Sequence, residues 1–331
     1  MENVSGKKNR IEWIDTARGI GIILVILGHI GFGRFNQWIY SFHLPLFVFL
    51  SGLLFNPKVP FKTLIKKRVK SLIIPYFCFG VIIMIEEMIS YSRFDFDYFI
   101  CFIRDLVIQR RFRFIWFITF IFVIEIGFYL LQKAIKNKVA LGIVVFALSA
   151  AVYVHNFMTK NALVWNADAS IFMLPVFYIG AILADKIDRL ELFLKKYYLL
   201  LVLAGLAVST ASVFLLGNTM ELFDVNFGIP IVNYISALAG IAFVVVISFL
   251  TRNTAFDYIG KNSLSYYLTH LYIAFPITSS VMSTFNITIN EYDSFIHINM
   301  CKLIFLFLTI IMCTTIDWLL KAMKCNFIIG K

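Results

Sequence analysis

The chain has 331 residues, of which 60% are hydrophobic and only 15% are charged, and its mean hydropathy is +0.85. Soluble globular domains are closer to half apolar and a quarter charged, so this composition excludes an ordinary soluble protein. The net charge of +11 would suggest a nucleic-acid partner in a soluble chain. Membrane proteins instead concentrate Lys and Arg in their cytoplasmic loops, and we therefore predict no nucleic-acid partner.

Apolar runs of roughly 20 residues, the length that crosses a hydrocarbon core, recur along the whole chain. They predict an all-α polytopic bundle of about ten transmembrane helices, forming a single domain over residues 1–331. The first run lacks an obvious small-residue cleavage site, so we expect a retained helix rather than a signal peptide. The predicted spans are 13–33, 37–55, 71–89, 114–132, 139–155, 170–184, 197–217, 229–250, 264–284 and 302–320.

Lysine and arginine are unevenly distributed between the predicted loops. If the N-terminus lies inside, most of these residues fall on the inner side, in segments such as 58–70, 133–138 and 186–196. The positive-inside rule therefore places both termini in the cytoplasm. Segment 90–113 is the exception, because it carries five arginines on the predicted outer side. Either these arginines have a function there, or part of the segment folds back into the protein.

The first predicted helix carries three ionisable residues, Asp15, Arg18 and His29, in an otherwise apolar run. Such groups cost several kcal/mol at membrane depth and usually face a cavity or a partner. Asp15 and Arg18 have the i, i+3 spacing that allows pairing. Arg18 and His29 share one helix face, separated by roughly 16 Å along the axis. This shared face favours a functional site over its alternatives, which are an interfacial ion pair and a histidine that only packs between helices.

The second predicted helix follows after a short loop, so we expect it to lie antiparallel to the first. His43 would then enter from the same side as His29, and Pro45 would loosen the helix around it. The alternative is a kinked packing helix with an interfacial histidine. The five cysteines show no C-x-x-C spacing, so we predict neither a metal site nor a disulfide framework.

These motifs together resemble the bacterial membrane acyltransferase-3 family, whose members include O-acetyltransferases of surface polysaccharides, lipopolysaccharide O-antigens and peptidoglycan. The pattern D-x-x-R-G-x9-H at 15–29 is followed by FHLPLFVFLSGLLF at 42–55. Further similar elements follow in the family's order: KKRVKSLIIPY at 66–76, Trp116-Phe117, FYIGAIL at 177–183 and IGKNSLSYYLTHL at 259–271. The resemblance covers most of the chain, and the family core also has about ten helices.

The resemblance implies transfer of an acyl group from cytoplasmic acyl-CoA, usually acetyl-CoA, to a hydroxyl of a glycan acceptor. It also implies a multi-pass protein of the bacterial cytoplasmic membrane, in contact with membrane lipid. We expect His29 to be the general base, or in a variant to carry the acyl group transiently. Arg18 would bind donor phosphates or stabilise developing negative charge, and Asp15 would orient Arg18.

The remaining candidates divide between the two substrates. Arg68, Lys261 and His270 are expected on the acyl-CoA side, and His43, Trp116 and Arg113 on the glycan side. Positive-inside placement is the alternative for Arg68, and an interfacial aromatic belt is the alternative for Trp116. Two other functions stay open, a transporter of glycans or lipid-linked sugars and a sensor or assembly subunit without chemistry. No internal repeat of the kind that many transporters show is apparent.

Overall fold

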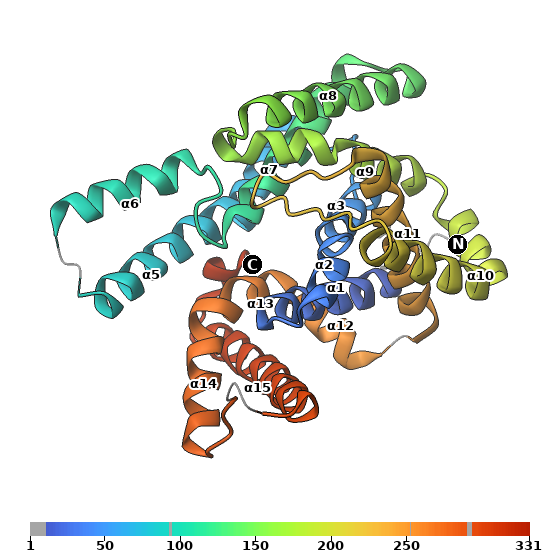
Figure 1. Ribbon diagram of the computed structural model, residues 1–331. Helices are drawn as coiled ribbons and strands as arrows, with labels where there is room; N and C mark the ends of the chain where they lie inside the picture. The colour runs from blue at the N-terminus through green and yellow to red at the C-terminus, as the bar shows by residue number, and fades with distance from the viewer. Residues whose placement is uncertain (1–10, 93–94, 252, 290–292) are drawn as a thin grey trace.

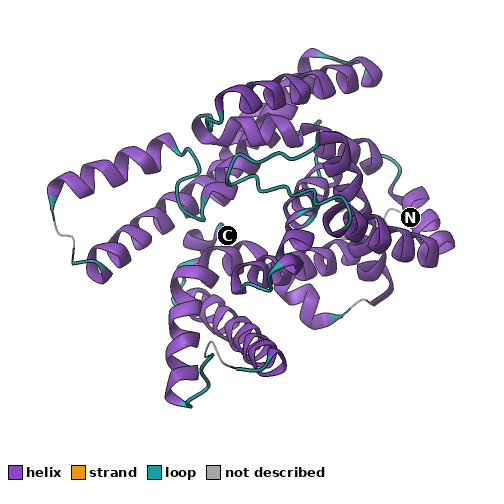
Figure 2. Cartoon of the chain, in the orientation of Figure 1, coloured by secondary structure: helices purple, strands orange, loops and turns teal. Residues whose placement is uncertain are grey.

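The computed structural model describes residues 11–331 except 93–94, 252 and 290–292. The described residues form helices joined by loops, and the β structure among them is one isolated bridge between Glu221 and Asn226 (Figures 1 and 2). A helix satisfies its own backbone hydrogen bonds, which a hydrocarbon environment requires. The prediction of an all-α protein is confirmed.

Eight helical stretches in the described part of the chain are long and apolar enough to cross a membrane. The protein is therefore a multi-pass membrane protein. The count of ten spans and the cytoplasmic position of both termini remain predictions. The eight stretches are Glu12–Ile30, Phe61–Ser90, Trp116–Ala134, Lys138–Thr159, Val164–Ala184, Ile187–Phe214, Pro230–Thr251 and Phe295–Ala322. They correspond to α1, α4–α5, α7, α8, α9 with the 3-10 turn Val164–Asn166 before it, α10, α11 and α15.

The second predicted span, 37–55, is not one helix. The structure divides it into α2 (Arg34–Tyr40) and α3 (His43–Leu53), with Phe42 at non-helical φ and ψ between them. Pro45 lies in the first turn of α3, where its missing N–H removes no helical hydrogen bond. The expectation that Pro45 loosens a continuous helix is therefore wrong, because the helix begins just before it.

Two helices contain a widened π turn, and each turn is followed by a proline. A proline inside a helix has no N–H to donate to the carbonyl four residues earlier, and its ring clashes with that carbonyl. Widening the turn just before Pro75 and Pro276 accommodates both effects. The first such helix runs through α4 (Phe61–Arg68), Val69–Ile73 and α5 (Ile74–Ser90). The second runs through α13 (Ser263–Thr269), His270–Ala274 and α14 (Phe275–Thr284).

Apart from helices such as α4 that extend a predicted span, two helices of the described chain lie in segments that the sequence pattern assigned to loops. Inside 90–113 the chain forms α6 (Phe96–Ile108), which Asp95 caps by accepting a hydrogen bond from the Tyr98 amide. α5 and α6 form a hairpin that projects from the bundle (Figure 1). Before α13 lies the short α12 (Thr254–Lys261). Both are shorter than a membrane span, so the search for long apolar runs missed them.

Helix α1 lies at the centre of the bundle, where it packs against α3, α11, α12 and α13. Its contact with α12 is backbone to backbone, because a Cβ added to Gly19 or Gly260 would collide with the carbonyl of Phe256 or Asp15. This close crossing holds the Asp15 end of α1. The opposite end, which carries His29, borders a cavity.

Candidate active site

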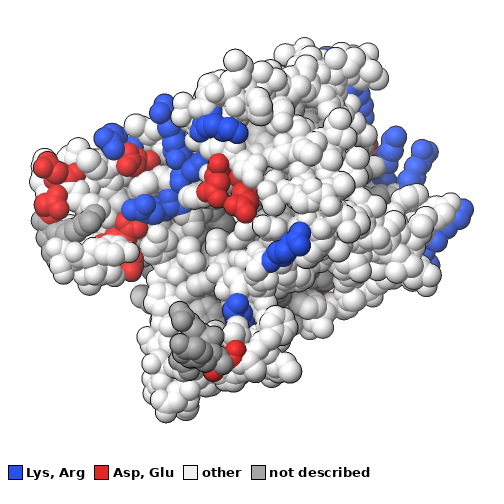
Figure 3. All heavy atoms as spheres, viewed as in Figure 1, with Lys and Arg blue, Asp and Glu red and all other residues white. Residues whose placement is uncertain are grey.

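A cavity of about 900 Å³ lies at the His29 end of α1, within the size range of small-molecule sites. Its walls come from α1, α2, α3, the end of α6, the loop 109–115, the start of α7, the loop 218–229 and the helix that contains His270–Ala274. Acidic and basic side chains gather side by side on this face of the molecule (Figure 3). The cavity therefore combines apolar walls with charged groups, as binding sites commonly do.

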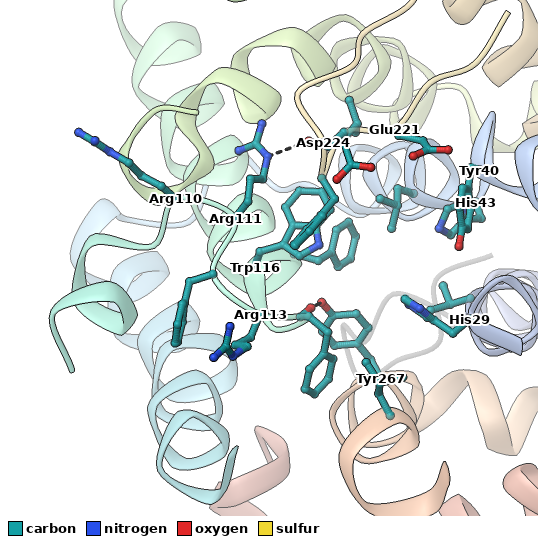
Figure 4. A pocket seen from close by; sticks show the side chains of 18 of the residues that line it. His29, Tyr40, His43, Arg110, Arg111, Arg113, Trp116, Glu221, Asp224 and Tyr267 are labelled. Atoms are coloured by element: carbon teal, nitrogen blue, oxygen red, sulfur yellow. Dashed lines mark hydrogen bonds between the residues drawn. The ribbon is translucent and has the colours of Figure 1, made fainter. Parts of the chain in front are cut away.

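Three histidines lie at or beside this cavity. His29, in the last turn of α1, is exposed and points into the cavity (Figure 4). His43, the first residue of α3, lines it as well, and its Nδ1 lies 2.9 Å from the Ile39 carbonyl oxygen. A carbonyl only accepts, so Nδ1 of His43 carries the proton. His270 is buried, and its ring centroid lies 5.2 Å from that of His29. No metal-binding group of three or more His, Cys, Asp or Glu occurs in the described residues.

Arg111 connects three distant segments in the cavity wall. Its guanidinium donates to both carboxylate oxygens of Asp168, at 3.0 and 2.7 Å, and its Nε donates to the Leu222 carbonyl at 2.7 Å. It also donates to Asn166 and lies over the Trp116 ring, 5.4 Å from its centroid. Burial lowers the pKa of Arg111, and the Asp168 charge acts in the opposite direction. The buried pair thus ties the loop 218–229 to the start of α9 (Ala167–Ala184).

Arg113 takes a different partner from the hairpin beside the cavity. Its Nε and Nη2 donate to the two carboxylate oxygens of Glu87 on α5, at 2.7 and 2.8 Å. The hydrogen bonds that Arg113 donates to Glu87 raise the pKa of Arg113. Glu87 also accepts from the hydroxyls of Tyr98 and Tyr272. Part of segment 90–113 therefore folds back into the protein, because Arg111 is buried, and both Arg111 and Arg113 line the cavity. Whether these arginines have a function stays a prediction.

Two carboxylates, Glu221 and Asp224, line the cavity on the side of the loop 218–229 (Figure 4). The bridge between Glu221 and Asn226 closes the tip of this loop. Burial raises the pKa of Glu221, and the hydrogen bond and charge of Asp224 raise it further. Sequence reasoning missed both residues, together with Tyr40 and Tyr267, because isolated polar residues at loop tips or helix ends carry no spacing signal.

The charged residues at the other end of α1 form a separate cluster. Arg68 is ion-paired through Nε with Glu125, which is buried on α7 (Trp116–Ala134). Arg18 lies near enough to Glu125 to interact with its charge. Asp15 is buried in the first turn of α1, and Lys261 is exposed at the end of α12. The sequence had assigned no role to Glu125.

The structure thus sorts the predicted site residues into two groups. His29, His43, Trp116 and Arg113 line one cavity. Arg18 and Arg68 meet at Glu125, about 16 Å from His29 along α1. His270 was expected beside Arg68 and Lys261, but it lies against His29. Trp116 is buried in the cavity wall, which does not match a lipid-facing aromatic belt.

The fold and this site define a class, a helical membrane protein with an accessible imidazole in a partly polar cavity. The family model described as an acyltransferase domain, that of the acyltransferase-3 family, matches residues 11–320. The chain therefore belongs to the acyltransferase-3 family and is an enzyme of the O-acyltransferase type. No curated protein and no solved structure matches the chain significantly.

Proposed function

We propose that the protein moves an acetyl or other short acyl group from acyl-CoA to a hydroxyl of a cell-surface or lipid-linked glycan, with His29 as general base. The observation that carries this proposal is the exposed imidazole of His29 inside a cavity of about 900 Å³. Together with membership of the family, it favours acyl transfer over the transporter alternative, which requires no base in the cavity.

The chemistry requires a proton acceptor because a hydroxyl is a poor nucleophile at neutral pH. A neutral imidazole takes the hydroxyl proton as the oxygen attacks the thioester carbon. The carbon–oxygen bond forms, the carbon–sulfur bond breaks, and the imidazolium returns the proton to the departing thiolate. In the alternative order the acyl group first bonds to His29 and the glycan hydroxyl then displaces it.

The lining of the cavity suits a sugar acceptor. Trp116 presents an aromatic ring, which can lie against the apolar face of a sugar. The carboxylates of Glu221 and Asp224 can accept hydrogen bonds from sugar hydroxyls, and Arg113 and His43 offer further polar contacts. We assign acceptor binding to His43, Trp116 and Arg113, and we add the two carboxylates.

We place the acyl-CoA donor at the Asp15 end of α1, opposite His29. Arg18, Arg68 and Lys261 supply cations for the phosphates of CoA, and Asp15 orients Arg18. With the N-terminus in the cytoplasm, this end would face the cytoplasmic acyl-CoA of a bacterial cell membrane. The long arm between the phosphates and the thioester would then run along α1 towards His29.

In the test, radiolabelled acetyl-CoA and a panel of candidate glycans are added to membranes that contain the protein. His29→Ala should lower label transfer by about 100-fold or more, the contribution of a general base. His155→Ala is the matched control, because His155 is exposed on α8 (Lys138–Thr159) and does not line the cavity. Undiminished transfer by a folded His29→Ala protein would refute the catalytic assignment. Glycan movement without donor consumption would favour the transporter.

A further inference from the structure

His270 is a buried histidine to which the reaction above gives no task. Its Nδ1 lies 2.7 Å from the Tyr267 carbonyl oxygen and 3.2 Å from that of Tyr266. Because both groups only accept hydrogen bonds, Nδ1 carries the proton. Nε2 is then a bare lone pair, and in the described part of the chain it is buried without a hydrogen-bond partner. Such an unsatisfied buried atom is uncommon and costly.

Among the rings around His270, one can donate a hydrogen bond to that lone pair. The rings around it belong to His29, Phe114, Tyr267 and Phe275. Phenylalanine cannot donate, and the Tyr267 hydroxyl already donates to the Phe114 carbonyl. The ring centroids of His29 and His270 are 5.2 Å apart with their planes at 41°. This separation accommodates one hydrogen bond of about 3 Å between facing ring nitrogens.

The local backbone holds His270 in place. It is the first residue of the π turn His270–Ala274, and such turns are frequent at functional sites. Tyr272 in the same turn stacks on Phe114 and donates to Glu87. Nδ1 of His270 is bound to the backbone, and Tyr272 holds the same turn against Phe114 and Glu87. His270 therefore presents Nε2 in a fixed direction, whereas the His29 side chain is exposed to the cavity.

We infer that His270 is a positioning residue for His29, on which the proposed function rests. Nε2 of His270 has no partner in the arrangement that the structure describes, and a turn of the exposed His29 ring brings Nδ1–H of His29 into position to donate a hydrogen bond to it. This bond selects the tautomer of His29 whose unprotonated Nε2 faces the cavity, as the orienting partner of a catalytic histidine does elsewhere. His270 does not take the proton. The hydroxyl proton goes to Nε2 of His29 and then to the thiolate.

The titratable groups that face this pair come from several elements. His270 faces His29 and Tyr267. His29 borders the cavity whose other ionisable side chains near α1 are His43 and Tyr40, with Glu221, Asp224 and Arg113 further round its wall. These groups are the same in both variants described below, so a comparison of the variants cancels their influence.

Two substitutions at His270 separate the two nitrogens. In His270→Asn, the amide nitrogen takes the place of Nδ1 and can still donate to the Tyr267 carbonyl, but nothing replaces Nε2. In His270→Gln, the longer amide can place its oxygen where Nε2 was and accept from His29. A structural role through the backbone bond predicts that Asn is tolerated better. The inferred role predicts that Gln is tolerated better.

The first measurement is independent of donor and acceptor. The full-length protein in detergent is treated with diethyl pyrocarbonate, which modifies unprotonated imidazole, and labelling of each histidine is followed by peptide mass spectrometry from pH 5 to 8. At His29 the rate in His270→Asn should fall about fivefold, the factor expected for one lost hydrogen bond, and His270→Gln should stay near wild type. Exposed His155 is the internal control and should not change.

The second measurement is acyl transfer by the same proteins. We expect kcat to fall in His270→Asn and to be largely restored in His270→Gln, with KM for the donor unchanged in both. Equal behaviour of the two variants, or better function of His270→Asn, overturns the inference. Loss of transfer in every protein, wild type included, refutes the proposed substrates instead, and the labelling of His29 still decides the role of His270.

Discussion

The buried pair of Arg111 and Asp168 allows a quantitative test of how the cavity wall is held. We expect Arg111→Leu to leave the Asp168 carboxylate, which is fully buried, with only the Asn156 amide at 2.8 Å and the Leu163 amide at 3.3 Å as donors. It would also leave the Leu222 carbonyl without the Arg111 donor. The loss of stability should therefore be the one expected when a buried charge has lost its partner.

Removing one partner of a buried pair costs about 3–5 kcal/mol. For a chain of this size, each kcal/mol lowers the midpoint of thermal unfolding by about 2 °C. The expected drop for Arg111→Leu is therefore about 6–10 °C. The double variant Arg111→Leu/Asp168→Asn removes the stranded charge and should recover much of this loss. Acyl transfer should fall as well, because the loop that carries Glu221 loses the hydrogen bond between Arg111 and the Leu222 carbonyl.

The measurement is thermal unfolding of the detergent-solubilised protein, followed by tryptophan fluorescence at constant lipid and salt. Arg104→Leu is the matched control, because Arg104 forms an exposed ion pair with Asp105 in the same region, and such pairs contribute at most about 1 kcal/mol. An Arg111→Leu protein that loses no more stability than Arg104→Leu would show the reasoning to be wrong. So would a double variant that is less stable than the single one.

Two further predictions concern the helix crossing and the carboxylate pair. Gly260→Ala should prevent close packing of α1 on α12, because its Cβ would collide with the Asp15 carbonyl. The control Gly127→Ala adds a methyl group in open space and should be tolerated. Equal yields of folded protein from the two variants would contradict this prediction. The pKa of Glu221 is raised from 4.5, which means that its carboxyl group holds a proton more tightly in the folded state than in the unfolded state. The stabilisation that this proton gives the folded state is therefore complete below pH 4.5 and is lost as the pH rises through the folded pKa. Glu221→Gln should therefore flatten the fall in thermal stability between pH 5 and 8, and an identical slope in both proteins would contradict the assignment.

The membrane class and most of the long helices could be predicted from sequence because hydrocarbon thickness requires long apolar runs. The helical period also predicts that Arg18 and His29 share one face of α1, but it could not show that Arg18 lies near Glu125 while His29 lines a cavity. The break before α3 could not be predicted, because residues 37–55 form one largely apolar run. Apolarity alone does not show whether the backbone continues through Phe42.

The arginine loop shows a second limit of sequence reasoning. Arg111 pairs with Asp168 and Arg113 with Glu87, and each partner lies in another helix. One sequence without relatives contains no signal for such distant pairings. The same holds for His270, whose depth depends on how α13 packs against α1. Its position along the chain suggested the donor side, while the packing places its ring 5.2 Å from that of His29.

The position of His29 depends on three residues near the end of α1, of which only Tyr40 lines the cavity. The last carbonyls of a helix have no partner within the helix. Here the Gly28 carbonyl accepts from Asn36 at 2.7 Å and from Tyr40 at 2.9 Å, and the Gly31 carbonyl accepts from Lys302 on α15 (Phe295–Ala322). A lysine at this end also interacts favourably with the helix dipole. For the general base that we propose, a shift of about an ångström is costly, so the hydrogen bonds to the Gly28 and Gly31 carbonyls belong to the proposed site as much as the cavity wall does.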